Sequence, residues 1–417
     1  MGHPSRYSSN GFERALLVGV FDAKRNRSNQ QTSLDELQRL AETAGAEVLA
    51  SELHELRDIH PATFIGQGRA AALGTSAGVL GAQTVIFDED LTPSQNRNLE
   101  KILGRKVIDR TGLILDIFAR RARTREGKLQ VELAQLRYLL PRLAGRGSEF
   151  SQLAGGIGTR GPGETKLEMD RRKAKERISF VRKELKRVQS HRGLHRGRRN
   201  ELPIATVSLV GYTNAGKSTL MNRLTNAAVL VEDKLFATLD PTVRRLKLPS
   251  GREILLSDTV GFVRKLPHQL VESFRATFEE VEGSSLLLHV IDASHPHTEE
   301  QVTVVDRVLE ELGLHRKPLL KVFNKSDLGG NGHDPNHLAI SALTGQGVES
   351  LLEAVDRKLS ESFRFVALRL PYEAGAALSV IYRTGRVLKR EDRPDGIHLE
   401  AVVDDKHYSK FLHFQER

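Results

Sequence analysis

The stretch GYTNAGKST constrains the fold most strongly. It matches the pattern G-x-x-x-x-G-K-[ST] at residues 211–218, after the apolar run ATVSLV and before the helix-like run STLMNRLT. A phosphate-binding loop needs this context, because glycines let the backbone wrap around phosphates at the N-terminus of a helix. Lys217 is expected to reach the β- and γ-phosphates, and the Ser218 hydroxyl is expected to bind Mg²⁺. The stretch therefore predicts a nucleotide site between a buried strand and a helix.

A second motif follows the strand-like run REILLS, which ends in DTVG. In this D-x-x-G pattern, Asp258 is expected to hold Mg²⁺ through a water molecule. The Gly261 amide is expected to sense the γ-phosphate. Together with Lys217, these residues predict a site that distinguishes nucleoside triphosphate from diphosphate.

Two further motifs predict which base is bound. The run LLKVFNKSD ends in N-K-x-D, where Asp327 can accept hydrogen bonds from guanine N1–H and the exocyclic amine. Adenine has no such pair of donors, so the motif favours GTP over ATP. Asn324 and Lys325 are expected to brace the loop and the base, and the Ala342 amide of S-A-L to meet the guanine carbonyl oxygen. Four motifs at strand ends, in this order, are typical of Ras-like GTPases.

The segment DKLFATLDPT lies between the phosphate loop and DTVG, where the first switch of such a protein belongs. We expect Thr238 to be the second protein ligand of Mg²⁺, with Thr242 as the alternative. Asn214 of the phosphate loop suggests a further hypothesis, in which it helps bind K⁺ beside the transferring phosphate.

Phe262 occupies the position after Gly261, where many switch GTPases have a glutamine that orients the attacking water. A phenyl ring cannot orient water by hydrogen bonding. Because phosphoryl transfer depends mainly on positioning and charge stabilisation, a partner can supply what is missing. We therefore expect slow intrinsic hydrolysis that a partner accelerates. The alternative is that Phe262 only packs under the second switch.

The order of strand-like and helix-like runs predicts an α/β protein with four parts. Residues 1–123 alternate strands and helices, which favours a parallel sheet, and the GQGR segment within them is interpreted as a plain turn. Residues 124–200 are expected to form an antiparallel hairpin of two helices with a glycine-rich loop and a hinge. Residues 201–363 would be the P-loop GTPase domain, and 364–417 a small α+β domain.

The helical hairpin carries the excess charge of the chain. Residues 160–199 contain 15 Lys/Arg and 5 Asp/Glu, a difference that equals the net charge of +10 of all 417 residues. Such a local excess favours a polyanionic partner, although a solvated helix explains it about as well. The loop AGRGSEFSQLAGGIGTRGPGET joins the two helices, and its flanking basic residues favour a role in probing that polyanion.

Composition excludes several classes of site. With no cysteine, the chain has no disulfide framework, thiolate metal site or Cys nucleophile, which is consistent with a reducing cytoplasm. The N-terminal residues have no apolar core of a secretory signal. The longest apolar run, LLLHVIDA, is far shorter than the ~20 residues that span a bilayer. We expect a cytoplasmic protein without membrane insertion, and a monomer.

The motifs together resemble the HflX family of translational GTPases over nearly the whole chain. The most specific parts are GGIGTRGPGETKLEMDRRKAKERI and DTVGFVRKLPHQLVESFRATFEEV, and FIGQGR and DLTPSQNRNLE resemble its N-terminal domain. The resemblance implies a GTPase that binds the large ribosomal subunit and separates stalled or idle ribosomes. It also implies that the glycine-rich loop enters the peptidyl-transferase region and contacts ribosomal RNA, and that ribosomal proteins are further partners. The residues suited to RNA contact are Arg146, Arg160, Lys166, Arg171 and Arg172.

The predicted site combines catalytic, metal and nucleotide-binding residues. Lys217, Thr238 and Gly261 are the expected catalytic residues, and Ser218, Thr238 and Asp258 the expected Mg²⁺ ligands. The expected nucleotide-binding residues are Gly211, Tyr212, Thr213, Asn214, Ala215, Gly216, Lys217, Ser218, Thr219, Phe236, Ala237, Thr238, Leu239, Asp240, Asp258, Thr259, Val260, Gly261, Asn324, Lys325, Asp327, Ser341, Ala342 and Leu343.

Three alternatives remain open at this point. An ATP-driven RNA remodeller would use the N-terminal domain and would keep ATPase activity after Lys217→Ala. A non-enzymatic anti-association factor would use GTP only as a conformational ligand. A GTPase of tRNA modification or iron transport shares the N-A-G-K-S loop, but the chain has neither a terminal cysteine nor membrane spans.

Overall fold

The chain divides into two compact units in the computed structural model. One unit comprises Met1–Leu185, Asp233–Leu239 and Arg264–Phe274, and the other comprises Lys186–Glu232, Asp240–Val263 and Arg275–Arg417. Among the described residues, no helix is both long and apolar enough to cross a membrane. The structure describes residues 12–22, 27–56, 58–143, 162–200, 204–225, 235–265, 267, 281–329, 337–361, 363–404 and 408–415.

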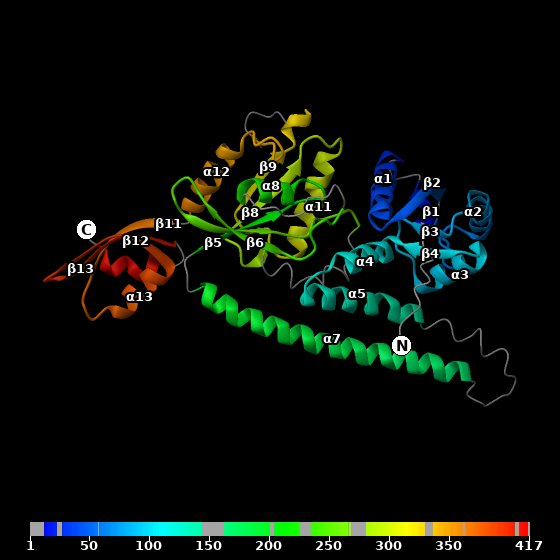
Figure 1. Cartoon of the computed structure of the whole chain (residues 1–417), viewed down its shortest axis with the longest axis horizontal. Helices are drawn as coiled ribbons and strands as arrows, with labels where there is room; N and C mark the ends of the chain where they lie inside the picture. The colour runs from blue at the N-terminus through cyan, green and yellow to red at the C-terminus, as the bar shows by residue number, and fades with distance from the viewer. Residues whose placement is uncertain are drawn as a thin grey trace. The chain divides into compact units, whose positions relative to one another are not determined.

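A four-stranded parallel sheet with helices forms the core of the first unit, as the alternating pattern predicts (Figure 1). The strand order is β2-β1-β3-β4. The central residues Ala15, Leu16, Leu17 and Val18 of β1 are fully buried, and β1 pairs with one strand on each side. The elements are β1 (Glu13–Asp22), α1 (Arg27–Thr43), β2 (Ala46–Leu56), α2 (Gln67–Leu80), β3 (Thr84–Phe87), α3 (Pro93–Leu103), β4 (Lys106–Asp109) and α4 (Arg110–Arg121).

Helices α5 (Arg125–Leu143) and α7 (Pro162–Asn200) form the predicted pair. The leucines of α5 pack against Ile178, Val181 and Leu185 of α7. Arg125 pairs with Glu184, and Arg177 pairs with Glu132. These two pairs show that the helices run antiparallel. The predicted antiparallel pair of helices is therefore confirmed. Helix α7 continues to Asn200, through residues that we expected to form a hinge, since an interior glycine costs a helix only about 1 kcal/mol.

The second unit contains a six-stranded sheet in the order β10-β9-β8-β5-β7-β6. All neighbouring strands are parallel except β6 and β7. Every residue of β8 is buried, as expected for a strand in the middle of a covered sheet. The elements are β5 (Ala205–Val210), α8 (Lys217–Thr225), β6 (Thr242–Lys247), β7 (Glu253–Asp258), β8 (Leu286–Asp292), α11 (Thr298–Glu311), β9 (Leu319–Asn324), η1 (Ser326–Leu328), β10 (Leu338–Ala339) and α12 (Val348–Ser360).

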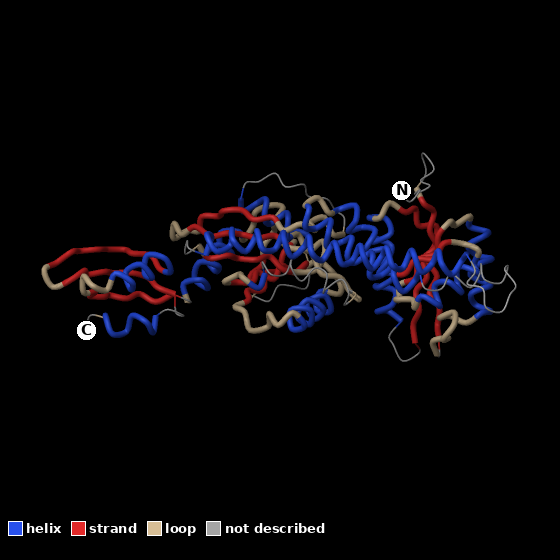
Figure 2. Tube along the Cα trace, turned by 90° about the horizontal axis from the view of Figure 1, so that it is seen from below, coloured by secondary structure: helices blue, strands red, loops and turns tan. Residues whose placement is uncertain are grey.

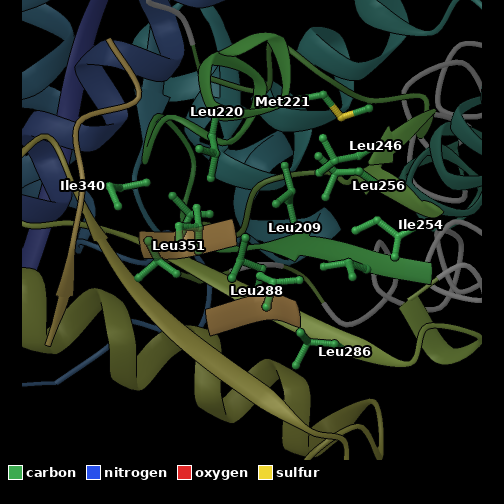
Figure 3. Close-up of a cluster of buried hydrophobic side chains, with 14 of the residues drawn as sticks. Leu209, Leu220, Met221, Leu246, Ile254, Leu256, Leu286, Leu288, Ile340 and Leu351 are labelled. Atoms are coloured by element: carbon green, nitrogen blue, oxygen red, sulfur yellow. The ribbon is translucent and has the colours of Figure 1, made fainter. Parts of the chain in front are cut away.

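Apolar side chains from this sheet and its helices meet in one core. Figure 3 shows Leu209 and Leu288 on the sheet, near Leu220 of α8. Leu351 of α12 and Ile340 belong to the same cluster. All five are at most 1% exposed. This packing fixes the strand ends, and the predicted phosphate and base motifs follow directly from those ends.

Residues after α12 form a small antiparallel sheet in the order β11-β13-β12 (Figure 2). Alternate residues such as Val366, Leu368 and Leu370 are buried, and Phe365 is exposed. The predicted α+β part is confirmed. Its elements are β11 (Phe363–Leu370), α13 (Gly375–Thr384), β12 (Gly385–Arg393), β13 (Gly396–Asp404) and η2 (Ser409–Phe414).

Candidate nucleotide-binding site

The phosphate loop runs from the end of β5 to the start of α8. Asn214 has φ 62° and Gly216 has φ 92°, a backbone region that favours glycine and tolerates asparagine. A side chain at Gly216 would collide with the Asn324 amide. The Lys217 ammonium donates hydrogen bonds to the carbonyls of Gly211, at 3.1 Å, and Tyr212, at 2.7 Å. Lys217 therefore arches back over the loop, where it can meet phosphate oxygens.

Burial lowers the pKa of Lys217. The side chain is 6% exposed, and loss of hydration lowers the pKa of Lys217 to about 8, while the nearby Asp258 carboxylate acts in the opposite direction. A bound polyphosphate would add negative charge and raise this pKa. The loop thus holds a cation whose charge an anionic ligand would stabilise.

Two predicted Mg²⁺ ligands lie side by side. The Ser218 hydroxyl donates to Asp258 Oδ2 at 2.7 Å, and Asp258 is 1% exposed at the end of β7. A hydroxyl and a carboxylate are hard oxygen donors of the kind that Mg²⁺ prefers, so the pair fits this ion. Thr238 belongs to the first unit, and its role as a further ligand stays a prediction.

The D-x-x-G segment lies directly against the phosphate loop. Phe262 N–H donates to the Gly211 carbonyl at 3.1 Å, and Thr213 N–H donates to the Phe262 carbonyl at 2.8 Å. A Cβ at Gly261 would lie 2.8 Å from Thr213 Cα and 2.9 Å from the Lys217 ammonium, so only glycine fits. Phe262 is 1% exposed. Its ring packs in the protein interior, as the packing alternative expected, and it offers no hydrogen bond to a water molecule.

Asn324 joins three of the predicted loops. Its amide donates to the Ala215 carbonyl of the phosphate loop at 2.8 Å, and its Oδ1 accepts from the Ala342 amide at 2.9 Å. The side chain is 2% exposed. Asn324 therefore braces the loop, as predicted, although the Ala342 amide already has an acceptor that guanine would have to share.

Lys325 and Asp327 occupy the rest of the N-K-x-D turn. Lys325 has φ 66°, and its ammonium pairs with Asp292 Oδ2 at 2.6 Å. Asp327 is exposed, so its carboxylate is open to a ligand. We did not predict a role for Asp292, although a carboxylate at the end of the apolar strand β8, beside the strand that leads into N-K-x-D, was an available signal.

Comparison with known proteins identifies the family. The GTPase HflX of Caldanaerobacter subterraneus subsp. tengcongensis is 48% identical over 396 residues, which cover 94% of this chain and 91% of that protein. The GTPase HflX of Escherichia coli is 44% identical over 393 residues, 92% of each protein. The chain belongs to the HflX family of GTPases. The matching family models are GTP-binding GTPase N-terminal (residues 31–119), GTP-binding GTPase Middle Region (121–199), 50S ribosome-binding GTPase (206–325) and HflX C-terminal domain (330–410).

Membership of the HflX family confirms the resemblance, and it makes the protein a GTP hydrolase that binds guanine nucleotides with Mg²⁺. The role of K⁺ stays a prediction.

Among solved structures, a GTP-binding protein of Sulfolobus solfataricus in complex with GDP has a TM-score of 0.43 and 25% identity, covering 84% of this chain and 99% of that chain.

Two switch segments of this HflX protein pack within the first unit. Phe236 lies edge-on to Phe118 of α4, with ring centroids 4.7 Å apart. The Lys265 ammonium, three residues after Phe262, pairs with Asp88 Oδ2 at 2.5 Å and Glu89 Oε1 at 2.7 Å. The sequence analysis missed these contacts, because nothing in DTVGFVRK indicates which distant residue Lys265 meets.

The structure describes the side chains of only some of the predicted RNA-binding residues. Arg171 and Arg172 are exposed on α7. Lys166 belongs to the same helix, but its side chain lies outside the described residues. Arg146 and Arg160 also lie outside them. RNA binding by all five residues stays a prediction.

We expect Lys217 to take up protons when a nucleotide binds above neutral pH. With a pKa of about 8, Lys217 is largely neutral at pH 8.5 in the free protein, and a bound polyphosphate should restore its charge. We expect GDP binding to take up roughly 0.7 proton at pH 8.5 and almost none through this group at pH 6.5. Titration calorimetry in buffers of different ionisation enthalpy measures this. Equal proton uptake at both pH values would contradict the assignment.

Proposed function

We propose that this HflX protein binds the large ribosomal subunit and separates stalled or idle ribosomes in the cytoplasm, with hydrolysis stimulated by the ribosome. The family model for residues 206–325 is described as a 50S ribosome-binding GTPase, which supports this partner. Glycine-rich residues outside the described part of α5 and α7 would reach the peptidyl-transferase RNA. Ribosomal proteins would make further contacts.

The observation that carries the proposal is a row of cations on α7. Arg171, Lys175, Arg182 and Lys186 are all exposed. At 3.6 residues per turn, their spacing places them within about 60° of one another around the helix. None of the four has an acidic partner among the described residues. This basic row fits the phosphate backbone of RNA, which attracts cations regardless of base sequence.

The nucleotide site supports the dependence on a partner. Lys217, Ser218 and Asp258 supply phosphate and Mg²⁺ contacts, but Phe262 is buried and cannot orient water. Docking on the ribosome would order the switch segments and add the missing positioning, which is how partners accelerate several GTPases. Thr238 would then complete the Mg²⁺ site.

The first unit gives little support to an ATP-driven RNA remodeller. Asp88 and Asp109 follow or end the short strands β3 and β4, at the sheet edge where ligands of parallel α/β folds bind. Both are buried and engaged with arginines. Carboxylates at this edge would repel a triphosphate, and no phosphate loop occurs in residues 1–123.

Subunit separation tests the proposal directly. Whole ribosomes are mixed with the protein and GTP, or a non-hydrolysable GTP analogue, and the fraction of free subunits is measured by sedimentation. We expect separation with both nucleotides if hydrolysis serves release, and none with GDP. No separation with any nucleotide, despite binding to the large subunit, would contradict the proposed action.

The basic row has its own matched test. Neutralising Arg171, Lys175 and Arg182 to alanine should weaken large-subunit binding and reduce the salt dependence of log K, by up to about one per lost phosphate contact. The control neutralises three exposed arginines elsewhere, Arg69, Arg307 and Arg357. Equal weakening by both triple variants would indicate a general charge effect and refute a specific role for α7.

A further inference from the structure

Arg223, in the last turn of α8, contacts the loop of the S-A-L motif. Its Nε donates to the Ala342 carbonyl at 3.1 Å, and its Nη2 donates to the Leu343 carbonyl. These carbonyls belong to a loop more than a hundred residues further along the chain. Arg223 thus links the helix that begins at the phosphate loop with the loop predicted to read guanine.

The rest of this loop is closed by its own backbone. Gly345 N–H donates to the Ser341 carbonyl at 2.8 Å, and Ser341 N–H donates to the Gln346 carbonyl at 2.9 Å. Thr344 N–H donates to Ser341 Oγ at 3.1 Å. Internal bonds therefore set the shape of the loop, and Arg223 is an external brace at its outer carbonyls.

Holding a carbonyl also sets the direction of the N–H in the same peptide group. Because a peptide unit is planar and trans, the Leu343 N–H points away from the side on which the Ala342 carbonyl meets Arg223. The Ala342 N–H is anchored on Asn324 Oδ1 at 2.9 Å. Asn324 therefore anchors the Ala342 amide, and Arg223 orients the next amide, that of Leu343.

We propose that Arg223 is a positioning residue for recognition of the guanine C6 oxygen, acting through the Leu343 amide, which follows the Ala342 amide anchored on Asn324. The inference rests on the guanine site proposed from the N-K-x-D and S-A-L motifs. A C6 carbonyl oxygen accepts these amide donors, whereas a purine without that oxygen cannot. The brace from Arg223 keeps the donors in place before the base arrives, which lowers the ordering cost of binding.

The test compares two nucleotides that differ at C6 and, as a consequence, at N1. GDP carries the C6 oxygen and an N1–H, and the diphosphate of 2-aminopurine riboside carries neither. Arg223→Met keeps most of the side-chain length and removes both donors. We expect it to weaken GDP binding about threefold to tenfold, as loss of one part-buried and one exposed charge-assisted hydrogen bond implies, and to change analogue binding less than about twofold. Arg223→Lys should recover part of the GDP affinity.

The control is Arg307→Met, which removes an exposed arginine of α11 in the same sheet domain and should leave both dissociation constants unchanged. Steady-state turnover should show a raised KM for GTP and an unchanged kcat in Arg223→Met. Equal weakening of GDP and the analogue, or no weakening of GDP, would overturn the role of Arg223. If the parent protein binds GDP and the analogue equally, the loop does not read the C6 oxygen, and the guanine site itself is misassigned.

Discussion

Replacing Asp327 with asparagine is expected to move the base preference from guanine to xanthine. The exposed Asp327 carboxylate can accept from both guanine N1–H and the exocyclic amine. An asparagine amide instead presents one acceptor and one donor, which match N1–H and the C2 oxygen of xanthine. A site built on such hydrogen bonds rejects the mismatched base strongly, so the ratio of GTP to XTP affinity should fall on the order of 10⁴-fold.

Competition binding with GTP and XTP measures this ratio. The control is Asp306→Asn, which alters an aspartate of α11 that is 47% exposed and pairs with Lys321, away from the N-K-x-D turn. It should leave the ratio unchanged. If Asp327→Asn binds the two nucleotides in the parent's ratio, the carboxylate does not contact the base, and the N-K-x-D assignment is wrong.

Asp88→Ala should destabilise the first unit by about 3–5 kcal/mol. Asp88 and Arg110 are each 1% exposed and pair at 2.6 Å, and Glu36 contacts the same guanidinium. Asp88 also accepts from the Ser33 hydroxyl at 2.6 Å and pairs with Lys265. Removing this carboxylate leaves a buried guanidinium with part of its compensation lost, which costs far more than losing a surface ion pair.

Hydrogen exchange of the amides in β1 and β3 reports the opening free energy of this sheet. Glu89→Ala is a matched control, because Glu89 pairs with the same Lys265 but is partly exposed, and it should cost about 1 kcal/mol or less. Similar losses in the two variants would mean that the Lys265 contact, rather than the buried Asp88–Arg110 pair, holds the unit together.

Short motifs predicted the nucleotide site because their geometry is local. Gly216 and Gly261 leave no space for a side chain, and Lys217 reaches back only six residues to Gly211. Ser218 and Asp258 meet because the phosphate loop follows β5 and Asp258 ends β7, and these two strands are neighbours in the sheet. The order of strand ends along the chain was enough to anticipate such contacts.

Long-range partners could not be predicted in the same way. Arg223 and Lys265 are charged residues whose sequence surroundings resemble those of ordinary solvated side chains. Their partners lie more than a hundred residues away, and only the packing of the folded chain brings them together. The alternation of elements likewise predicted a parallel N-terminal sheet, but not its order β2-β1-β3-β4.

The central claim is that a ribosome completes a GTPase site in which Phe262 replaces a water-orienting residue. The most direct measurement is GTP turnover by the full chain with and without purified large ribosomal subunits, in matched KCl and NaCl buffers. We expect slow turnover alone and strong stimulation by the subunit, and higher rates in KCl would support a role of Asn214 in binding K⁺. Fast turnover without subunits, and no stimulation with them, would contradict it.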